Sequence, residues 1–340
     1  KTNIGLEMML WGKLNLTLDY YWERRKDILI QRSSLPSMAG FDASIYANMG
    51  EMDNKGVDAN LEYQTRIGNK VGLRLFGNLT YSKNKIVFRD EPAMQYAYQK
   101  SEGTRYGEFY GYIAEGYFQS EEEIKKSPRQ MRELAPGDIK YKDLNDDGVI
   151  DANDQCYLGK SWFPSWSYGM GFNINYHNFD LALFFQGVSD VSIMANGGSI
   201  DTGNGDWGAS GVGIVPFTGM GLNPSNVITK ALDRWTADNP RADAWYPRMT
   251  ANATTNDNNY VNSTHWLKDG SYLRLKQASL GYTLENKKLM DKGIEYLYFY
   301  LSGQNLLTFS KFKLWDPELG SNGAKYPLSR MVTLGMRVSF

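Results

Sequence analysis

The sequence predicts an all-β protein, and within that class a transmembrane antiparallel β-barrel. Apolar residues recur at every second position in about nine separate stretches, as they do in strands with one apolar face. The connections between the stretches alternate between short and long, the rhythm of barrels with short periplasmic turns and long external loops. Charged residues occupy the polar positions of the stretches, where a wet or plugged lumen accepts them and a dry core does not.

The stretch from Trp166 to Gln186 shows this pattern most clearly. Apolar residues alternate with small or polar ones up to Tyr176, and the alternation resumes after a tight turn at His177-Asn178. The pattern predicts a hairpin with one apolar and one polar face. Its apolar face spans about eleven residues, and a tilted strand needs ~9–11 residues to cross a bilayer.

The remaining strands follow from the same alternation. Short turns at Gly12-Lys13 and at Gly68-Asn69-Lys70 join two further hairpins, and a Lys-rich link joins the next pair. The final strand ends at Phe340, which falls on the apolar face of that strand. Such an ending is typical of outer-membrane barrels. The strands are expected at about residues 4–10, 14–30, 57–65, 71–81, 166–176, 179–186, 271–284, 294–307 and 332–340.

Long external loops are expected between these hairpins, at about residues 32–51, 89–165, 192–269 and 308–330. Within them, Glu121–Lys126 predicts a short solvated helix. The segment Asn226–Trp235 predicts a second helix, which begins after Pro224-Ser225 and ends before Pro240.

A soluble β-sandwich is the alternative fold, because such a protein can turn the polar face of its strands to water. The strict alternation of connection lengths through nine strands favours the barrel. So does the density of charge on the polar parity, which comprises Asp19, Glu23, Asp58, Glu62, Arg74, Asp180 and Arg337.

Composition excludes several functions. The formal net charge of −1 provides no basic field for nucleic acid. The single Cys156 has no partner for an internal disulfide, and His177 and His265 are the only histidines and lie far apart. With so few candidate bases the sequence predicts no enzyme; Asp316 and Glu318, separated by Pro317, are interpreted as a rigid loop corner.

A series of motifs resembles the SusC/RagA family of TonB-dependent transporters. The segment Gly137–Asp151, GDIKYKDLNDDGVID, closely resembles a hallmark of that family. The other matches fall in family order across essentially all of the chain: 54–57 (NKGV), 110–112 (YGY), 116–119 (GYFQ), 179–181 (FDL), 184–187 (FFQG), 234–235 (RW), 272–276 (YLRLK), 305–307 (NLL), 316–318 (DPE) and 335–340.

The resemblance implies an outer-membrane barrel of about 22 strands with an internal plug, in a Gram-negative bacterium. Family members import glycans or peptides together with a SusD-like surface lipoprotein, using energy relayed by TonB. This chain contains only about nine C-terminal strands, without the plug and N-terminal regions. Its two open edges would not be stable in lipid, so we expect a portion of a longer barrel, with the TonB contact made by the upstream part.

The sequence is therefore compatible with two functions. The first is TonB-dependent import of oligomeric nutrients, either oligosaccharides or peptides. The alternative is a surface-exposed adhesin or carbohydrate-binding protein, which would be extracted without detergent, whereas a barrel requires it.

A candidate calcium loop lies within the hallmark segment. Calcium loops place oxygen ligands at positions 1, 3, 5, 7, 9 and 12, with glycine at position 6. Gly148 matches that glycine, and an aspartate replaces the usual glutamate at position 12. The alternative is that the Asp, Asn and Gly residues only shape a tight external turn. The candidate ligands are Asp143, Asn145, Asp147, Val149, Asp151 and Asp154.

Aromatic residues have two expected roles. Those on the apolar parity of the strands, such as Trp22 and Tyr176, are expected in the interfacial girdles of the barrel. Those in the loops are candidates for stacking on sugar rings or packing against a lid protein, although loops that pack upon themselves would use them equally well. These loop candidates are Trp162, Trp207, Trp245, Tyr246 and Trp315.

Overall fold

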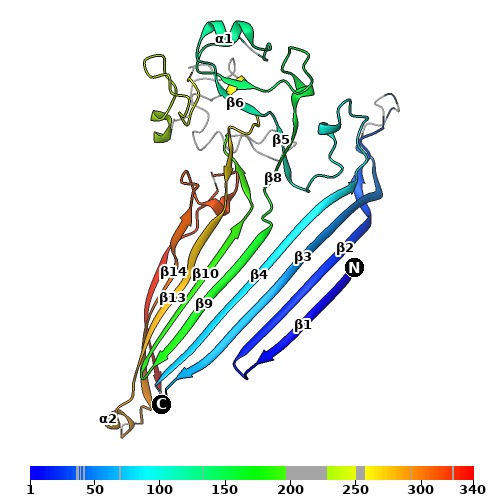
Figure 1. Ribbon diagram of the computed structural model, residues 1–340. Coiled ribbons are helices and arrows are strands. Elements are labelled where there is room, and N and C mark those ends of the chain that lie inside the picture. The colour runs from blue at the N-terminus through cyan, green and yellow to red at the C-terminus, as the bar shows by residue number, and fades with distance from the viewer. Residues whose placement is uncertain are drawn as a thin grey trace.

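The computed structural model describes residues 1–35, 38, 40, 43–68, 70–131, 133–196, 228–249, 257–291, 293–323 and 325–340. One large antiparallel sheet dominates it, with a cluster of loops above one end (Figure 1). Among the described residues, no helix is both long enough and apolar enough to cross a membrane.

Over the described residues the sheet has nine strands, which confirms the predicted strand number, and the order of the strands across the sheet follows their order along the chain. Such a meander is the strand order of an up-and-down barrel wall. The strands are β1 (Thr2–Leu10), β2 (Leu14–Gln31), β3 (Tyr46–Ile67), β4 (Val71–Phe88), β9 (Trp166–Tyr176), β10 (Phe179–Ser189), β13 (Tyr272–Leu284), β14 (Tyr296–Ser310) and β15 (Met331–Ser339).

The strand register places apolar residues of one strand opposite apolar residues of the next. The sheet therefore has one apolar and one polar face. Ile174 on β9 pairs with Leu181, which pairs with Leu280, and the row continues through Leu301 to Leu334. Leu301 is 48% exposed and Leu334 is 81% exposed. A continuous exposed apolar row of this kind is what a lipid-facing barrel wall presents.

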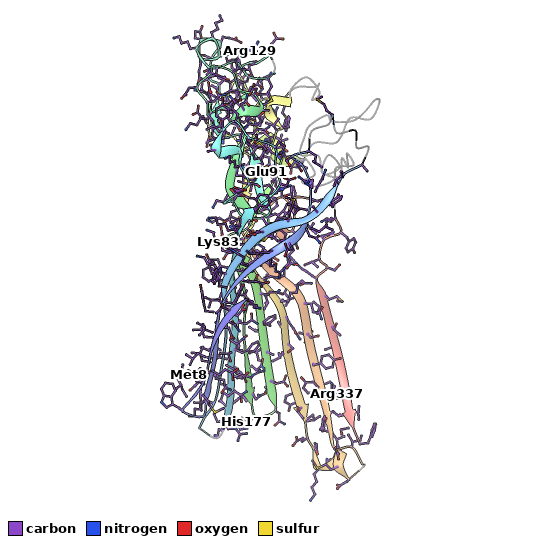
Figure 2. All side chains as sticks on the ribbon, turned by 90° about the vertical axis from the view of Figure 1, so that its right-hand side faces the viewer. Met8, Lys83, Glu91, Arg129, His177 and Arg337 are labelled. Atoms are coloured by element: carbon purple, nitrogen blue, oxygen red, sulfur yellow. The ribbon has the colours of Figure 1, made fainter. Side chains whose placement is uncertain are left out.

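Short and long connections lie at opposite ends of the sheet (Figure 1). The short ones span residues 11–13, 68–70, 177–178 and 285–295, the last containing helix α2 (Lys287–Met290). His177, in one short turn, lies at the same end as Arg337, whereas Glu91 and Arg129 belong to the loops at the other end (Figure 2). In the tight 177–178 turn, His177 has a φ of 52°, as two-residue hairpin turns require.

The first long loop is shorter than expected, because β3 begins at Tyr46 and leaves residues 32–45 as the connection. The β2–β3 hairpin continues beyond the alternating region through cross-strand ion pairs, among them Arg24 with Asp53 at 2.6 Å. Residues 46–56 lack clean alternation, which is why the sequence did not predict them as strand. The other long connections span residues 89–165, 190–271 and 311–330.

Short elements give the long loops their structure. The predicted helix at Glu121–Lys126 is present as α1, and the side chain of its N-cap Ser120 accepts a hydrogen bond from the Glu123 N–H. Of the helix predicted at Asn226–Trp235, the described part holds only the 3-10 helix η5, Thr229–Leu232. The Trp235 N–H donates to the Tyr246 carbonyl instead of continuing a helix.

Further short strands pair within these loops, and they belong to separate two-stranded sheets. The pairs are β5 (Glu108–Gly111) with β8 (Cys156–Ser161), β6 (Ala114–Tyr117) with β7 (Ile139–Tyr141), and β11 (Ser192–Met194) with β12 (Leu267–Asp269). Single turns of 3-10 helix complete the loops: η2 (Ala97–Gln99), η3 (Ala152–Asp154), η7 (Asp257–Asn259) and η8 (Pro317–Leu319).

The main hydrophobic core lies in these loops and not in the sheet. Side chains from the 89–165 and 190–271 connections pack into one group, which we call the loop core. Large aromatic side chains account for most of its volume, so the long loops form a folded layer at the external end. The buried members of the loop core are Phe109, Tyr112, Tyr117, Ile139, Tyr141, Ile150, Met194, Ala231, Trp235, Ala244, Tyr246 and Trp266.

Candidate functional site

The polar face of the sheet carries paired charges and aromatic contacts. Arg74 and Glu62 form a two-pronged ion pair, with nitrogen–oxygen distances of 2.9 and 3.1 Å. The Tyr298 hydroxyl donates to Asp180 at 3.0 Å. Pairing of this kind satisfies charges that face a barrel lumen. The face is therefore suited to water, a plug or a polar cargo, and not to lipid.

Glycines on the polar face make room for the aromatic rings there. Phe76 and Phe184 stack with ring centroids 6.1 Å apart. A Cβ on Gly171 would lie 2.5 Å from the Leu183 carbonyl oxygen and 2.6 Å from the Phe76 ring. Only glycine fits at this position without movement of the neighbouring strand.

The hallmark segment supplies the centre of the loop core. Strand β7 pairs with β6 on one edge, and side-chain amides complete its other edge: the Ile139 N–H donates to Asn259 Oδ1, and Asn258 Nδ2 donates to the Ile139 carbonyl. Gln130 Oε1 accepts from the Tyr141 N–H at 2.7 Å. Both asparagines are fully buried. These side-chain amides form the hydrogen bonds that the backbone of a paired strand would otherwise form with β7, because buried backbone groups need hydrogen-bond partners.

Asp138 anchors the same strand through charge. Its carboxylate is fully buried and lies 2.6 Å from Arg248 Nε, and it also accepts from Asn259 Nδ2 at 2.8 Å. Neither Arg248 nor Asn259 was singled out from the sequence. Both lie in an irregular loop more than a hundred residues further along, where periodicity gives no signal.

The candidate calcium loop, 143–154, is closed by its own hydrogen bonds. Asp143 accepts from the N–H groups of Asp146 and Gly148, and Asp147 from that of Val149. Asp154 is fully buried, and its two oxygens accept from the N–H groups of Leu144 and Asp151. Asn145 Nδ2 donates to Asp147, and Asp151 caps the short helix η3.

This geometry agrees with one feature of a calcium loop and departs from another. Gly148 has a φ of +82°, the sharp turn that position 6 demands. Both oxygens of Asp154 are taken by N–H donors, whereas position 12 normally supplies a bidentate ligand. Over the ranges the structure describes, no three His, Cys, Asp or Glu side chains are grouped so as to hold a metal.

The loop aromatics occupy different environments. Tyr246 is fully buried and packs edge-on against Trp266, so in this structure it offers no surface to a ligand. Trp162 is partly buried against Phe109. Trp315 is also partly buried, and its indole donates to the Gly320 carbonyl. Trp207 lies outside the described residues.

Trp245 differs, because it lines a groove as well as packing on the loop core. The groove has a volume of about 970 Å³ and runs between the 228–230, 268–269 and 311–314 segments. The Lys268 ammonium lies 5.3 Å from the centre of the Trp245 ring, within the range of a cation–π contact. Of the four predicted loop aromatics that the structure describes, Trp245 is the one that lines this groove.

His265 and the Asp316/Glu318 pair have structural partners. His265 Nε2 lies 3.2 Å from the Trp245 carbonyl oxygen; burial and then the nearby Lys268 charge lower the pKa of His265 to about 4. Asp316 and Glu318 form ion pairs with Arg274, at 2.6 and 3.3 Å. These contacts explain the two carboxylates as parts of a fold-stabilising cluster.

Comparison with known proteins agrees with this architecture. A family model described as TonB dependent receptor-like, beta-barrel matches residues 1–306. TonB-dependent receptor P3 of Formosa agariphila is 27% identical over 99% of this chain and 34% of its own length. TonB-dependent receptor SusC of Bacteroides thetaiotaomicron is 23% identical over 99% of this chain and 31% of its own. The chain thus spans about a third of the length of the curated relatives it matches.

Solved structures show the same fold. The RagAB peptide importer in its closed-closed state contains a chain that superposes with a TM-score of 0.72 at 23% identity, over 99% of this chain and 35% of that one. The family match covers most of the residues, and the fold, the two-faced sheet and the external loops agree with it. The chain therefore belongs to the family of TonB-dependent receptor-like β-barrels of the Gram-negative outer membrane.

Proposed function

We propose that this chain forms the C-terminal wall of a SusC/RagA-type importer, which moves oligomeric nutrients across the outer membrane in a TonB-dependent manner. The observation that carries the proposal is the two-faced sheet beneath a folded layer of external loops. The apolar face suits lipid, the paired charges of the other face suit a wet lumen, and the loop core holds the external surface in a defined shape.

The importer requires parts beyond these nine strands. Among the strands that the structure describes, the edge strands β1 and β15 each pair on one side only, and unpaired edges are not tolerated in lipid. We assign their missing partners to the remainder of the barrel, with the plug and the TonB contact in that same remainder. A SusD-like surface lipoprotein is the proposed partner at the loops, and the cargo is an oligosaccharide or a peptide.

The proposed transporter carries out no covalent chemistry. Asp316 and Glu318, the carboxylate pair interpreted from the sequence as a rigid loop corner, are held by the buried Arg274. Both carboxylates are therefore engaged in ion pairs that hold the loop in place, and neither is placed opposite a free partner as a glycosidase pair would be. Membership in a receptor-barrel family also favours import over the alternative of a soluble adhesin.

Calcium binding by the 143–154 loop stays a proposal within this function. Asp143 and Asp147 would hold the ion, and their present hydrogen bonds to backbone N–H groups shape the loop around them. The ion would stiffen the external layer, as calcium does in extracellular modules.

Energised uptake tests the proposed function. Cells that express the full-length protein and its lipoprotein partner would be given fluorescent oligosaccharides and oligopeptides, with and without an ionophore that collapses the inner-membrane potential. The proposal predicts uptake of at least one class, and loss of that uptake with the ionophore or on deletion of the gene. Uptake that is unchanged in both cases, or extraction of the protein without detergent, contradicts it.

A further inference from the structure

The groove beside Trp245 is strongly cationic. Its described lining residues include four lysines, Lys230, Lys268, Lys311 and Lys313, and one carboxylate, Asp269. The whole chain carries a formal net charge of −1. Positive charge is therefore concentrated in this groove and does not reflect the general composition.

Three of the lysines form no ion pair among the described residues, although the Asp269 carboxylate of the groove wall interacts electrostatically with Lys311. Lys230 pairs with Asp233 at 2.8 Å, but within the described ranges no ion pair engages Lys268, Lys311 or Lys313. The Lys268 ammonium donates to the His265 carbonyl at 2.6 Å and faces the Trp245 ring. Burial, and then the charge of Lys230, lower the pKa of Lys268. Neighbouring ammonium groups repel one another, and a bound anion removes that repulsion.

The other walls of the groove are aromatic and apolar. Trp245 and Phe312 lie among the lysines, with Ile228 and Leu314 beside them. The groove volume is at the upper end of the range of about 300–1,000 Å³ for small-molecule sites. A site with aromatic faces and separate positive charges fits a ligand that has flat apolar faces and anionic substituents.

We propose that this groove binds an acidic oligosaccharide, whose carboxylate or sulfate groups lie between Lys268, Lys311 and Lys313 while a sugar ring lies against Trp245. The inference rests on the proposed import function and assigns its cargo class. All four cations are lysines, which act as point charges and accept an anion in several orientations, whereas arginine favours planar two-pronged pairing. Anions fixed on a rigid ring also lose less conformational freedom on binding than flexible acidic side chains of a peptide.

Binding to the intact transporter, purified in detergent with its lipoprotein, tests this site. The probes are hexagalacturonate, its fully methyl-esterified form, and hexaglutamate, measured by titration calorimetry at low and at high salt. The esterified probe keeps the rings and removes the charges. The expected result is that hexagalacturonate binds about tenfold or more tightly than either other probe, and that high salt weakens its binding.

Two double variants test whether hexagalacturonate binds in this groove. Lys311→Gln/Lys313→Gln removes exposed charges of the groove and is expected to weaken hexagalacturonate binding about tenfold. Lys287→Gln/Lys288→Gln removes two exposed lysines from α2 at the other end of the sheet and is expected to leave the binding unchanged. Equal binding of the ester, equal binding of hexaglutamate, or full binding by the groove variant overturns the proposal.

The uptake assay separates this proposal from the import function. If the wild-type transporter binds hexagalacturonate no more tightly than its methyl ester but still takes up other oligomers in an energy-dependent manner, the acidic-oligosaccharide site is rejected and the import function stands. Tight hexagalacturonate binding without any energised uptake rejects import and leaves the groove as a binding site.

Discussion

Arg274 Nη2 lies 2.6 Å from Asp316 Oδ1, and only 2% of the Arg274 side chain is exposed. This ion pair joins strand β13 to the loop between β14 and β15, forty-two residues further along the chain. Glu318 approaches the same guanidinium at 3.3 Å. Two short motifs that look independent in the sequence, Tyr272–Lys276 and Asp316–Glu318, are therefore halves of one charged cluster at the external rim of the sheet.

Replacement of Arg274 by glutamine should loosen this rim. The partly buried Asp316 carboxylate would lose its guanidinium partner, and breaking such a buried ion pair costs about 3–5 kcal/mol. Limited proteolysis of the 311–330 loop in the intact protein measures the effect and should show faster cleavage. Arg330→Gln, an exposed arginine at the end of the same loop, is the control and should alter stability by less than about 0.5 kcal/mol. Equal cleavage of the two variants would show that the ion pair does not hold the loop.

Gly171→Ala tests the packing of the polar face. The added Cβ would lie 2.5 Å from the Leu183 carbonyl oxygen, so a neighbouring backbone would have to move, at a cost of about 1–3 kcal/mol. Gly72→Ala is the matched control, since its Cβ would meet no atom closer than 3.6 Å. Urea unfolding in lipid vesicles, followed by tryptophan fluorescence, should show a lower unfolding midpoint for Gly171→Ala than for Gly72→Ala. Equal midpoints for the two variants would mean that the strands around Gly171 move apart at little energetic cost.

His265 predicts a pH dependence of the loop core. Its pKa is about 4 in the folded chain, because burial and the charge of Lys268 disfavour the protonated ring, and near 6.5 when unfolded. Between these values the unfolded state binds the additional proton, so stability is full above about pH 6.5 and declines as the pH falls toward 4, by up to about 3 kcal/mol.

Hydrogen exchange of β6, β7 and β12 between pH 7 and pH 4.5 measures this decline. His265→Gln removes the titrating ring and should show a smaller decline, because the aspartates and glutamates are common to both proteins. A decline of the same size in wild type and variant would assign the pH dependence to the carboxylates instead.

The proposed calcium site predicts a saturable binding heat from the loop at 143–154. Weak sites in extracellular modules have dissociation constants on the order of 10⁻⁴ to 10⁻³ M, and a site with an aspartate at position 12 is expected in that range. The heat should vanish in Asp143→Asn/Asp147→Asn and remain in Glu121→Gln/Glu122→Gln, which removes two acidic residues from α1. No heat in the wild type would leave the loop as a turn closed by its own hydrogen bonds.

The sheet could be predicted from the sequence because its signal is local. Alternation with period two gave all nine strands, and the lengths of the connections distinguished the two ends. The 46–56 part of β3 was missed because Gly50 and the polar residues around it interrupt the alternation, while the ion pairs that extend the strand come from β2.

The organisation of the loops could not be predicted in the same way. Asn258, Asn259 and Arg248 complete the surroundings of Asp138 and Ile139 from more than a hundred residues away. No periodic pattern marks them, and their roles follow from backbone groups that only the folded chain brings together. The same holds for the four lysines of the groove, which come from three separate segments.

Spin labels on adjacent residues of β14 test the central claim, that this sheet is a barrel wall between lipid and a wet lumen. In a Cys156→Ala background, nitroxides would be placed at Leu301 and Ser302, and the intact protein reconstituted in lipid vesicles. We predict that oxygen, which concentrates in lipid, relaxes the label at 301 more strongly, and that a water-soluble nickel complex relaxes the label at 302. Equal accessibility of the two positions to both reagents would contradict the account.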